Sequence, residues 1–290
     1  MFSPSFASIS AARLARRTVP ACLMLASLLS LALPARADLM LHPTRVVFDK
    51  NVRATQIELI NNGTKPASYR ISLVNRRMTE DGQFASAETA QDGERFADEM
   101  LRYSPRQVTL QPGTAQTVRV MLRKPADLAE GEYRSHLQFD KLPDVEGNAS
   151  IESQRTGGTQ IGVTLNALVG ASIPVIVRHG NASAGVKLAG LALRRDDAKR
   201  PALALQFERE GNSSVYGDIS VTFTPKNGTP HSLAQVGGLA VYTPNRVRKA
   251  LLPLEVPAGV TLGAGTLEVS YRERPEAGGK LLAQASLSLP

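Results

Sequence analysis

IGVTLNALVGASIPVIV, Ile161 to Val177, is the stretch of sequence that decides the fold class. Every odd position in it is apolar, whereas the even positions are mostly small or polar, with Leu168 and Ile176 as exceptions. This alternation predicts an extended strand with one buried face, because successive side chains of a strand point to opposite sides. At roughly 3.3 Å per residue, such a strand would be much longer than the usual strand of about 5–6 residues. Its length raises the question of what buries its apolar face.

The sequence around this stretch consists of short alternating segments separated by turn residues, without a segment of helical period. In the first half the predicted strands are Ile57–Ile60, Tyr69–Val74, Gln107–Leu110, Gln116–Leu122 and Arg134–Phe139. In the second half they are Val186–Leu193, Ala202–Phe207, Ser220–Phe223, Gly238–Tyr242, Thr266–Tyr271 and Leu281–Leu289. Many short strands divided by turns predict an all-β sandwich. A hinge at 178–181 leaves enough residues for a second sandwich, since about 100 residues suffice for one.

Two segments interrupt the strand pattern. Thr79–Glu99 carries seven acids and one arginine, which predicts an exposed insertion. Asp144–Gln160 is rich in Gly, Ser, Asn and Gln and is interpreted as a flexible loop.

The N-terminus has the pattern of a secretory signal peptide, residues 1–37. Three arginines precede the apolar run Ala21–Leu33, and Ala35-Arg36-Ala37 is a cleavage pattern, so the mature chain is expected to begin at Asp38. The single cysteine, Cys22, lies inside this segment, which leaves the mature chain without a disulfide. No later segment approaches 18 apolar residues, so no membrane span is predicted.

Composition argues against several classes of function. Four arginines leave with the signal peptide, so the formal net charge falls from +8 to about +4. Trp is absent and no basic stripe with interleaved aromatics occurs, which argues against nucleic-acid binding. The four histidines have no metal-binding spacing, and no catalytic motif is present, so neither a metal, a cofactor nor an enzyme is predicted. A Ser-His-Asp triad assembled by the fold stays open.

Arg45 stands among apolar neighbours in HPTRVVFD and shares the strand face of Val47. An arginine in this position can hold a carboxylate through two parallel hydrogen bonds. The alternative is an outward-facing, solvated arginine on the first strand.

Four stretches in order along the chain resemble the periplasmic chaperones of the chaperone–usher pathway, which assist the assembly of bacterial pili. They are HPTRVVFDKN (42–51), ELINNGTKPASYR (58–70), LRYSPRQVTLQPGTAQTVRV (101–120) and EYRSHLQFDKLP (132–143). The resemblance implies two immunoglobulin-like domains in a boomerang, residues 38–179 and 180–290. It also implies a periplasmic location, with pilin-like subunits bound at the cleft and an outer-membrane usher as the second partner.

The resemblance also suggests what covers the long strand. In this family the strand before the hinge lends its edge to a pilin that lacks a strand, and alternate apolar side chains fill the groove of the pilin. The residues that match are Ile161, Val163, Leu165, Ala167 and Val169. A dimer of the free protein would hide the same edge. The alternative is a long strand buried in its own hairpin.

Further residues match family positions one by one. Arg45 matches the cleft arginine that anchors the carboxyl terminus of the subunit, and Glu132, Arg178 and Glu276 match an interdomain salt bridge. The chain departs from the family at Pro174, where a second anchoring lysine is expected. The absence of a cysteine pair argues against the long-loop branch of the family.

Two other classes of function remain as alternatives. A secreted tandem of immunoglobulin-like modules could serve as an adhesive or structural binding protein, using loops in place of strands. A secreted hydrolase on a β-sandwich is the third hypothesis, although no site motif supports it.

Overall fold

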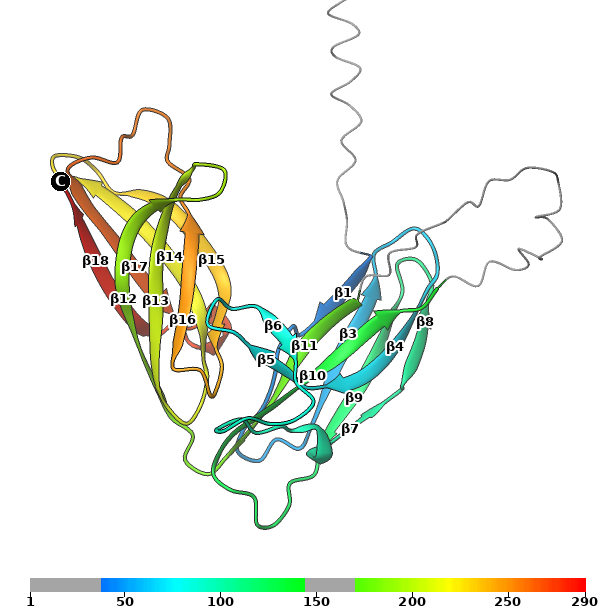
Figure 1. Cartoon of the computed structure of the whole chain (residues 1–290). Helices are drawn as coiled ribbons and strands as arrows, with labels where there is room; N and C mark the ends of the chain where they lie inside the picture. The colour runs from blue at the N-terminus through cyan, green and yellow to red at the C-terminus, as the bar shows by residue number, and fades with distance from the viewer. Residues whose placement is uncertain (1–37, 144–169) are drawn as a thin grey trace, which may run out of the picture. The chain divides into compact units, whose positions relative to one another are not determined.

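The computed structural model describes residues 38–143 and 170–290 (Figure 1). The predicted signal peptide, the predicted flexible loop and the predicted donor residues Ile161, Val163, Leu165, Ala167 and Val169 lie outside the described residues. Within the described part the chain is built from strands, in two successive β-sandwiches that belong to one compact unit. No helix in this part is both long and apolar enough to cross a bilayer. The predicted fold class, all-β with two immunoglobulin-like sandwiches, is confirmed.

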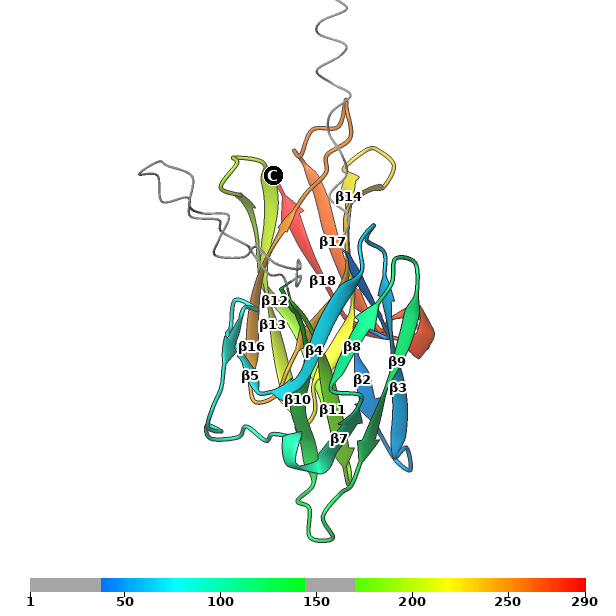
Figure 2. The same ribbon diagram turned by 90° about the vertical axis from the view of Figure 1, so that its right-hand side faces the viewer.

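The first sandwich packs two sheets around an apolar core (Figure 2). One sheet consists, in order, of β1 (Leu39–His42), β3 (Ala54–Asn61), β9 (Ala115–Leu122) and β7 (Leu101–Ser104). The other consists of β2 (Val46–Phe48), β11 (Gly170–His179), β10 (Gly131–Lys141), β4 (Ala67–Val74) and β8 (Gln107–Leu110). Alternate residues such as Ile57 and Leu59 on β3, or Leu137 and Phe139 on β10, point into the core and are fully buried.

The first strand of this sandwich is divided between the two sheets. β1 pairs antiparallel with β3, whereas β2 pairs parallel with the end of β11, with Val46 opposite Val175 and Phe48 opposite Val177. Arg45 directly precedes β2, so the prediction that it lies on a strand is wrong by one residue. The short β2 nevertheless fixes the position of Arg45 beside β11.

β11 is the described part of the long alternating strand. Ile173, Val175 and Val177 are buried in the core of the first sandwich, as the alternation predicts. β10 pairs along the whole of β11, but β2 covers only Val175–Val177 on the other side. Among the described residues, Gly170–Pro174 therefore has a strand on one side only.

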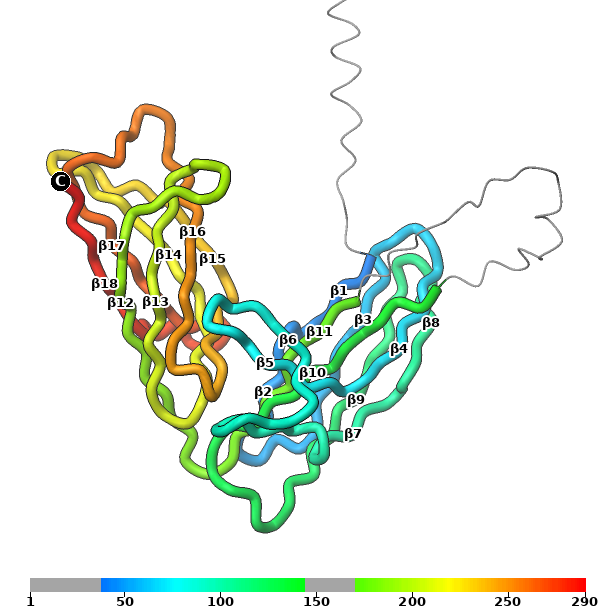
Figure 3. Tube along the Cα trace, viewed as in Figure 1, coloured from blue at the N-terminus to red at the C-terminus, as the bar shows by residue number. Residues whose placement is uncertain are grey.

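The second sandwich begins directly after β11 (Figure 3). One sheet has the order β12 (Ala184–Arg195), β13 (Pro201–Gly211) and β16 (Val247–Pro253). The other has the order β15 (His231–Val241), β14 (Val215–Pro225), β17 (Gly265–Arg272) and β18 (Leu281–Leu289). All six predicted strands occur here, and β16 is an additional strand that the sequence pattern did not predict.

The acid-rich segment begins directly after β5 (Arg76–Met78), contains its hairpin partner β6 (Phe84–Ser86), and ends within the single turn η2 (Asp98–Met100). β6 is exposed, as predicted, but Ala87, Glu94 and Ala97 are buried. The prediction of an exposed insertion is wrong for these residues, because the segment packs against both sandwiches.

Candidate functional site

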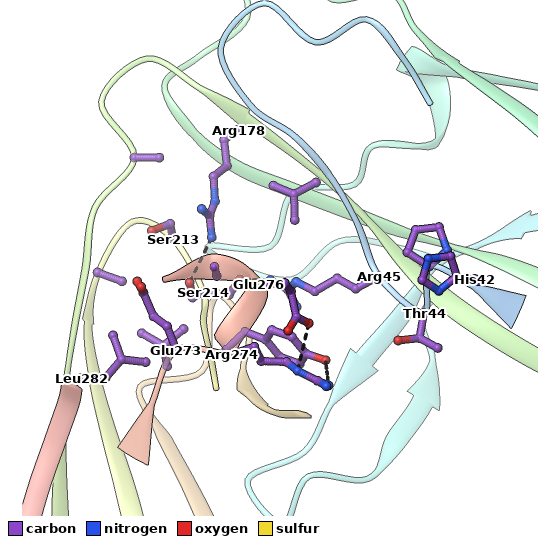
Figure 4. A pocket seen from close by; sticks show the side chains of 17 residues that line it. His42, Thr44, Arg45, Arg178, Ser213, Ser214, Glu273, Arg274, Glu276 and Leu282 are labelled. Carbon is purple, nitrogen blue, oxygen red and sulfur yellow. Dashed lines mark hydrogen bonds and ion pairs between the residues drawn. The ribbon is translucent and has the colours of Figure 1, made fainter. Parts of the chain in front are cut away.

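A cavity of about 590 Å³ is lined by residues of both sandwiches (Figure 4). The first sandwich contributes the segment His42–Arg45, which connects β1 and β2, together with Val47 and Arg178. The second contributes the start of β14 around Ser214 and the segment from Glu273 to Ala277 after β17. Arginines from both sandwiches and glutamates from the second thus face the same space.

Arg45 is held in this cavity by neutral groups. Its Nη1 donates to the hydroxyl of Tyr242 at 3.0 Å, and its Nη2 donates to Oγ of Ser214 at 3.1 Å. The guanidinium carbon also lies 4.5 Å from the ring centre of Tyr216, within the range of a cation–π interaction. In the described part of the chain, Arg45 has no carboxylate partner. Its orientation is therefore fixed while its charge stays available for an anion.

Glu132 and Arg178 meet at the junction of the sandwiches. The two residues are opposite each other on β10 and β11, and Nε of Arg178 lies 3.2 Å from Oε2 of Glu132. The same oxygen accepts hydrogen bonds from the backbone N–H of Ser214 at 3.0 Å and from its Oγ at 2.9 Å. Since the side chain of Glu132 is fully buried, these donors take the place of water at Oε2, whereas Oε1 has no hydrogen-bond partner among the described residues. The carboxylate thus joins the two sandwiches.

Glu276 belongs to a different ion pair. Its Oε1 lies 3.1 Å from Nε of Arg274, which is also 3.7 Å from Asp218. Nη1 of Arg274 donates to the hydroxyl of Tyr216 at 3.4 Å. The structure therefore brings Glu132 and Arg178 together and places Glu276 with Arg274, on the second-sandwich side of the cavity.

Pro174 occupies the position next to Arg45 in the parallel register of β2 and β11, since Val175 pairs with Val46. On its other side it pairs with His136, which is 2% exposed. Burial, together with the positive charges of Arg134 and Arg76, lowers the pKa of His136 to about 3, so this imidazole is neutral at neutral pH. It therefore does not replace the charge of the absent lysine.

Arg134 is a buried cation that sequence analysis did not identify. It is only 6% exposed, and its guanidinium carbon lies 4.2 Å from the ring centre of Tyr242, the same ring that Arg45 contacts. Burial lowers the pKa of Arg134, and the nearby acids Glu132 and Glu94 oppose this effect. No sequence signal marks it, because its neighbours come from distant parts of the chain.

The β5–β6 hairpin forms a second connection between the sandwiches. Nδ2 of Asn245 donates to the carbonyl of Met78 at 2.8 Å, and the backbone N–H of Lys249 donates to the carbonyl of Glu80 at 2.7 Å. Met78 also packs in an apolar cluster with Ile176 and Tyr242. The hairpin therefore binds the second sandwich through backbone hydrogen bonds and apolar contact.

Comparison with known proteins identifies the type of domain to which this cavity belongs. Residues 38–178 match the model of the pili and flagellar-assembly chaperone family, PapD N-terminal domain. Residues 38–178 of this chain thus form a PapD-type N-terminal domain of the pili and flagellar-assembly chaperones. No curated protein matches it by sequence.

Solved structures similar to this PapD-type chain are themselves chaperones, at low sequence identity. The YadV chaperone is 11% identical to this chain, with a TM-score of 0.44, and the match covers 87% of this chain and 100% of the YadV chain. The CupB2 chaperone of Pseudomonas aeruginosa has the same values. The CsuC–CsuE chaperone–tip adhesion subunit complex of Acinetobacter baumannii is 14% identical, with a TM-score of 0.43, and covers 87% and 98%.

Proposed function

We propose that this chain is a periplasmic, non-enzymatic chaperone that lends a strand to pilus subunits and delivers them to an outer-membrane usher. The observation that carries the proposal is the open side of Gly170–Pro174 next to the uncompensated Arg45. A strand with one free edge can pair with a client through main-chain hydrogen bonds. The family match of residues 38–178 supports the same function.

The alternating side chains before Gly170 would supply specificity. Ile161, Val163, Leu165, Ala167 and Val169 continue the register of Ile173 and Val175, which face the core of the first sandwich. A strand that is anchored in its own core at one end can present the same face to a client groove at the other. Covering that groove prevents edge-to-edge aggregation of the client. In the free protein a second copy would cover the same edge.

Arg45 would hold the carboxyl terminus of the client. Its guanidinium is oriented by Tyr242 and Ser214, so little conformational entropy is lost when a carboxylate binds. Two parallel N–H···O bonds would then set the register of the client strand against β11.

The junction residues would fix the spacing of the two sandwiches around the client. Glu132 and Arg178 act through Ser214, whereas the ion pair of Glu276 with Arg274 lies within the second sandwich and shapes that side of the cavity. Neither a metal nor a nucleotide takes part in this proposal.

The proposal is tested by expressing the chain in the periplasm together with the subunits encoded beside it. Leu165→Glu and Arg45→Ala should abolish recovery of a chaperone–subunit complex, while the variants themselves stay folded by circular dichroism. Thr164→Glu, on the opposite strand face, and Arg119→Ala, on the exposed side of β9, are matched controls that should leave the complex intact. Hydrogen exchange should show protection of 161–167 only when the client is present. Equal protection with and without client would refute strand donation.

A further inference from the structure

A second cavity, of about 580 Å³, adjoins the site described above and shares only Arg178 with the Arg45 cavity. It is formed by the turn between β2 and β3, the residues after β9, and the end of β11. The side chains that line it are mainly basic: Lys50, Arg53, Arg123, Lys124, Arg178 and His179, with Asp49 as the acid. The charge of Arg178 is matched by Glu132. Four cations therefore share this cavity with one carboxylate.

Two of these cations, Arg53 and Lys124, are held by backbone carbonyls and not by acids. Nη1 of Arg53 donates to the carbonyls of Lys50 at 3.0 Å and Val52 at 3.2 Å. Nζ of Lys124 donates to the carbonyl of Arg178 at 2.6 Å. In residues 38–143 and 170–290, neither Arg53 nor Lys124 forms an ion pair. A neutral acceptor fixes the direction of a cation but leaves its charge uncompensated.

The turn that carries Lys50 and Arg53 is itself ordered. The backbone N–H of Val52 donates to the carbonyl of Asp49 at 3.1 Å, and the N–H of Lys50 donates to Oδ1 of Asp49 at 2.8 Å. The acid of the cavity is thus engaged with its own turn. Partial burial lowers the pKa of Lys124, and the charge of Arg53 lowers it as well, while Asp49 opposes the shift, so Arg53 and Lys124 repel each other. An anion placed among them would remove this repulsion.

We infer that the cavity beneath Lys50, Arg53, Arg123 and Lys124 is a binding site for a phosphate-type oxyanion. Two guanidinium groups offer the planar pair of donors that matches phosphate geometry, and Lys124 adds a fixed point charge. An excess of about three positive charges over Asp49 favours a doubly charged oxyanion over a single carboxylate. Free phosphate and the head group of an anionic phospholipid share this chemistry.

The first experiment is titration of the mature chain with inorganic phosphate at constant ionic strength, with chloride as the competing anion. Amide chemical shifts of residues 49–53 and 123–124 should move, with saturation at millimolar phosphate. Lys124→Gln and Arg123→Gln should each weaken binding about tenfold, the loss expected for one charge-assisted hydrogen bond. Arg119→Gln removes an exposed cation from β9 outside the cavity and should leave binding unchanged.

A second arm separates the two sources of the phosphate group. The chain is sedimented with vesicles of phosphatidylglycerol in phosphatidylcholine. If head groups occupy the site, the wild-type chain should pellet with the vesicles and Lys124→Gln should stay in the supernatant. If the wild-type chain does not pellet with these vesicles but still binds phosphate, the site is assigned to a soluble phosphate. Absence of both interactions, or an equal loss in Arg119→Gln, would overturn the inference. Because none of these residues lines the Arg45 cavity, client binding should be unaffected by the variants, which keeps this test separate from that of the proposed function.

Discussion

Replacement of Glu132 by Gln tests whether a buried carboxylate holds the two sandwiches together. The change keeps the size of the side chain and one oxygen acceptor but removes the charge that meets Arg178 and two donors of Ser214. A hydrogen bond to a charged group contributes about 1.5–3 kcal/mol, against about 0.5–1.5 kcal/mol for a neutral one. Loss of roughly 1 kcal/mol at each of the three contacts gives a destabilisation of about 3 kcal/mol.

This value lies at the lower end of the range of about 3–5 kcal/mol for breaking a buried ion pair, because Arg178 stays partly solvated. Its side chain is 26% exposed and also donates to the carbonyl of Ser214 at 3.2 Å. The expected fall in Tm is about 6–12 °C for a chain of this size. Glu132→Ala should cost more, since it also leaves a cavity.

The assay is urea unfolding followed by circular dichroism, since the chain has no Trp to report by fluorescence. Glu80→Gln is the control, because the pair of Glu80 with Lys249 is exposed on both sides and should contribute little. A double-mutant cycle with Ser214→Ala should show coupling between Glu132 and Ser214. If Glu132→Gln proves no more destabilising than Glu80→Gln, the carboxylate does not tie the sandwiches and the reasoning fails.

Two further predictions concern the interior. The folded state keeps His136 neutral down to a pKa of about 3, whereas the unfolded chain binds a proton near 6.5. The free energy of unfolding should therefore fall as pH drops below 6.5, by about 2 kcal/mol at pH 5 from this residue alone. In His136→Gln the urea midpoint should depend less steeply on pH than in the wild-type chain. The same pH dependence in both would contradict the burial argument. Gly211→Ala should destabilise by more than about 2 kcal/mol, since φ is +92° and the added Cβ would lie 2.3 Å from the carbonyl oxygen of Ser183. Gly259→Ala has a similar φ of +84° but meets no atom within 4 Å, so thermal unfolding of the two variants should differ, and equal losses would refute the steric account.

The fold could be predicted because most strands in both halves of the chain have apolar residues at alternate positions, which mark the buried face. The missed strand β16 shows the limit of this signal. Its sequence, VRKALLP, has two cations followed by an apolar run, and only Leu252 is buried. Leu251 is exposed and Leu252 is buried, so apolar residues fall on both faces of this edge strand. Its sequence therefore does not alternate, and the pattern is not recognisable without its partner β13.

The site could be predicted only where one residue contrasts with its local neighbours. Arg45 stands out in an apolar segment, but its hydrogen-bond partners Ser214 and Tyr242 are 169 and 197 residues away. Arg134 and Arg274 have ordinary strand and turn contexts, so nothing local marks them as parts of one charged region. The acid-rich segment misled in the opposite direction, because its charges concealed the buried Ala87 and Ala97.

The position of Arg45 depends on both connections between the sandwiches. Ser214, which accepts from its Nη2, is held by the buried carboxylate of Glu132. Tyr242, which accepts from its Nη1, packs in the cluster that contains Met78 of the hairpin. Each of the two acceptors that orient the guanidinium is thus fixed by a different connection. Loosening either one would displace one acceptor and not the other, and the arginine would lose the fixed geometry that a two-bond carboxylate contact requires. The hairpin, which by composition is a solvated insertion, therefore contributes to the anchoring geometry without lining the cavity.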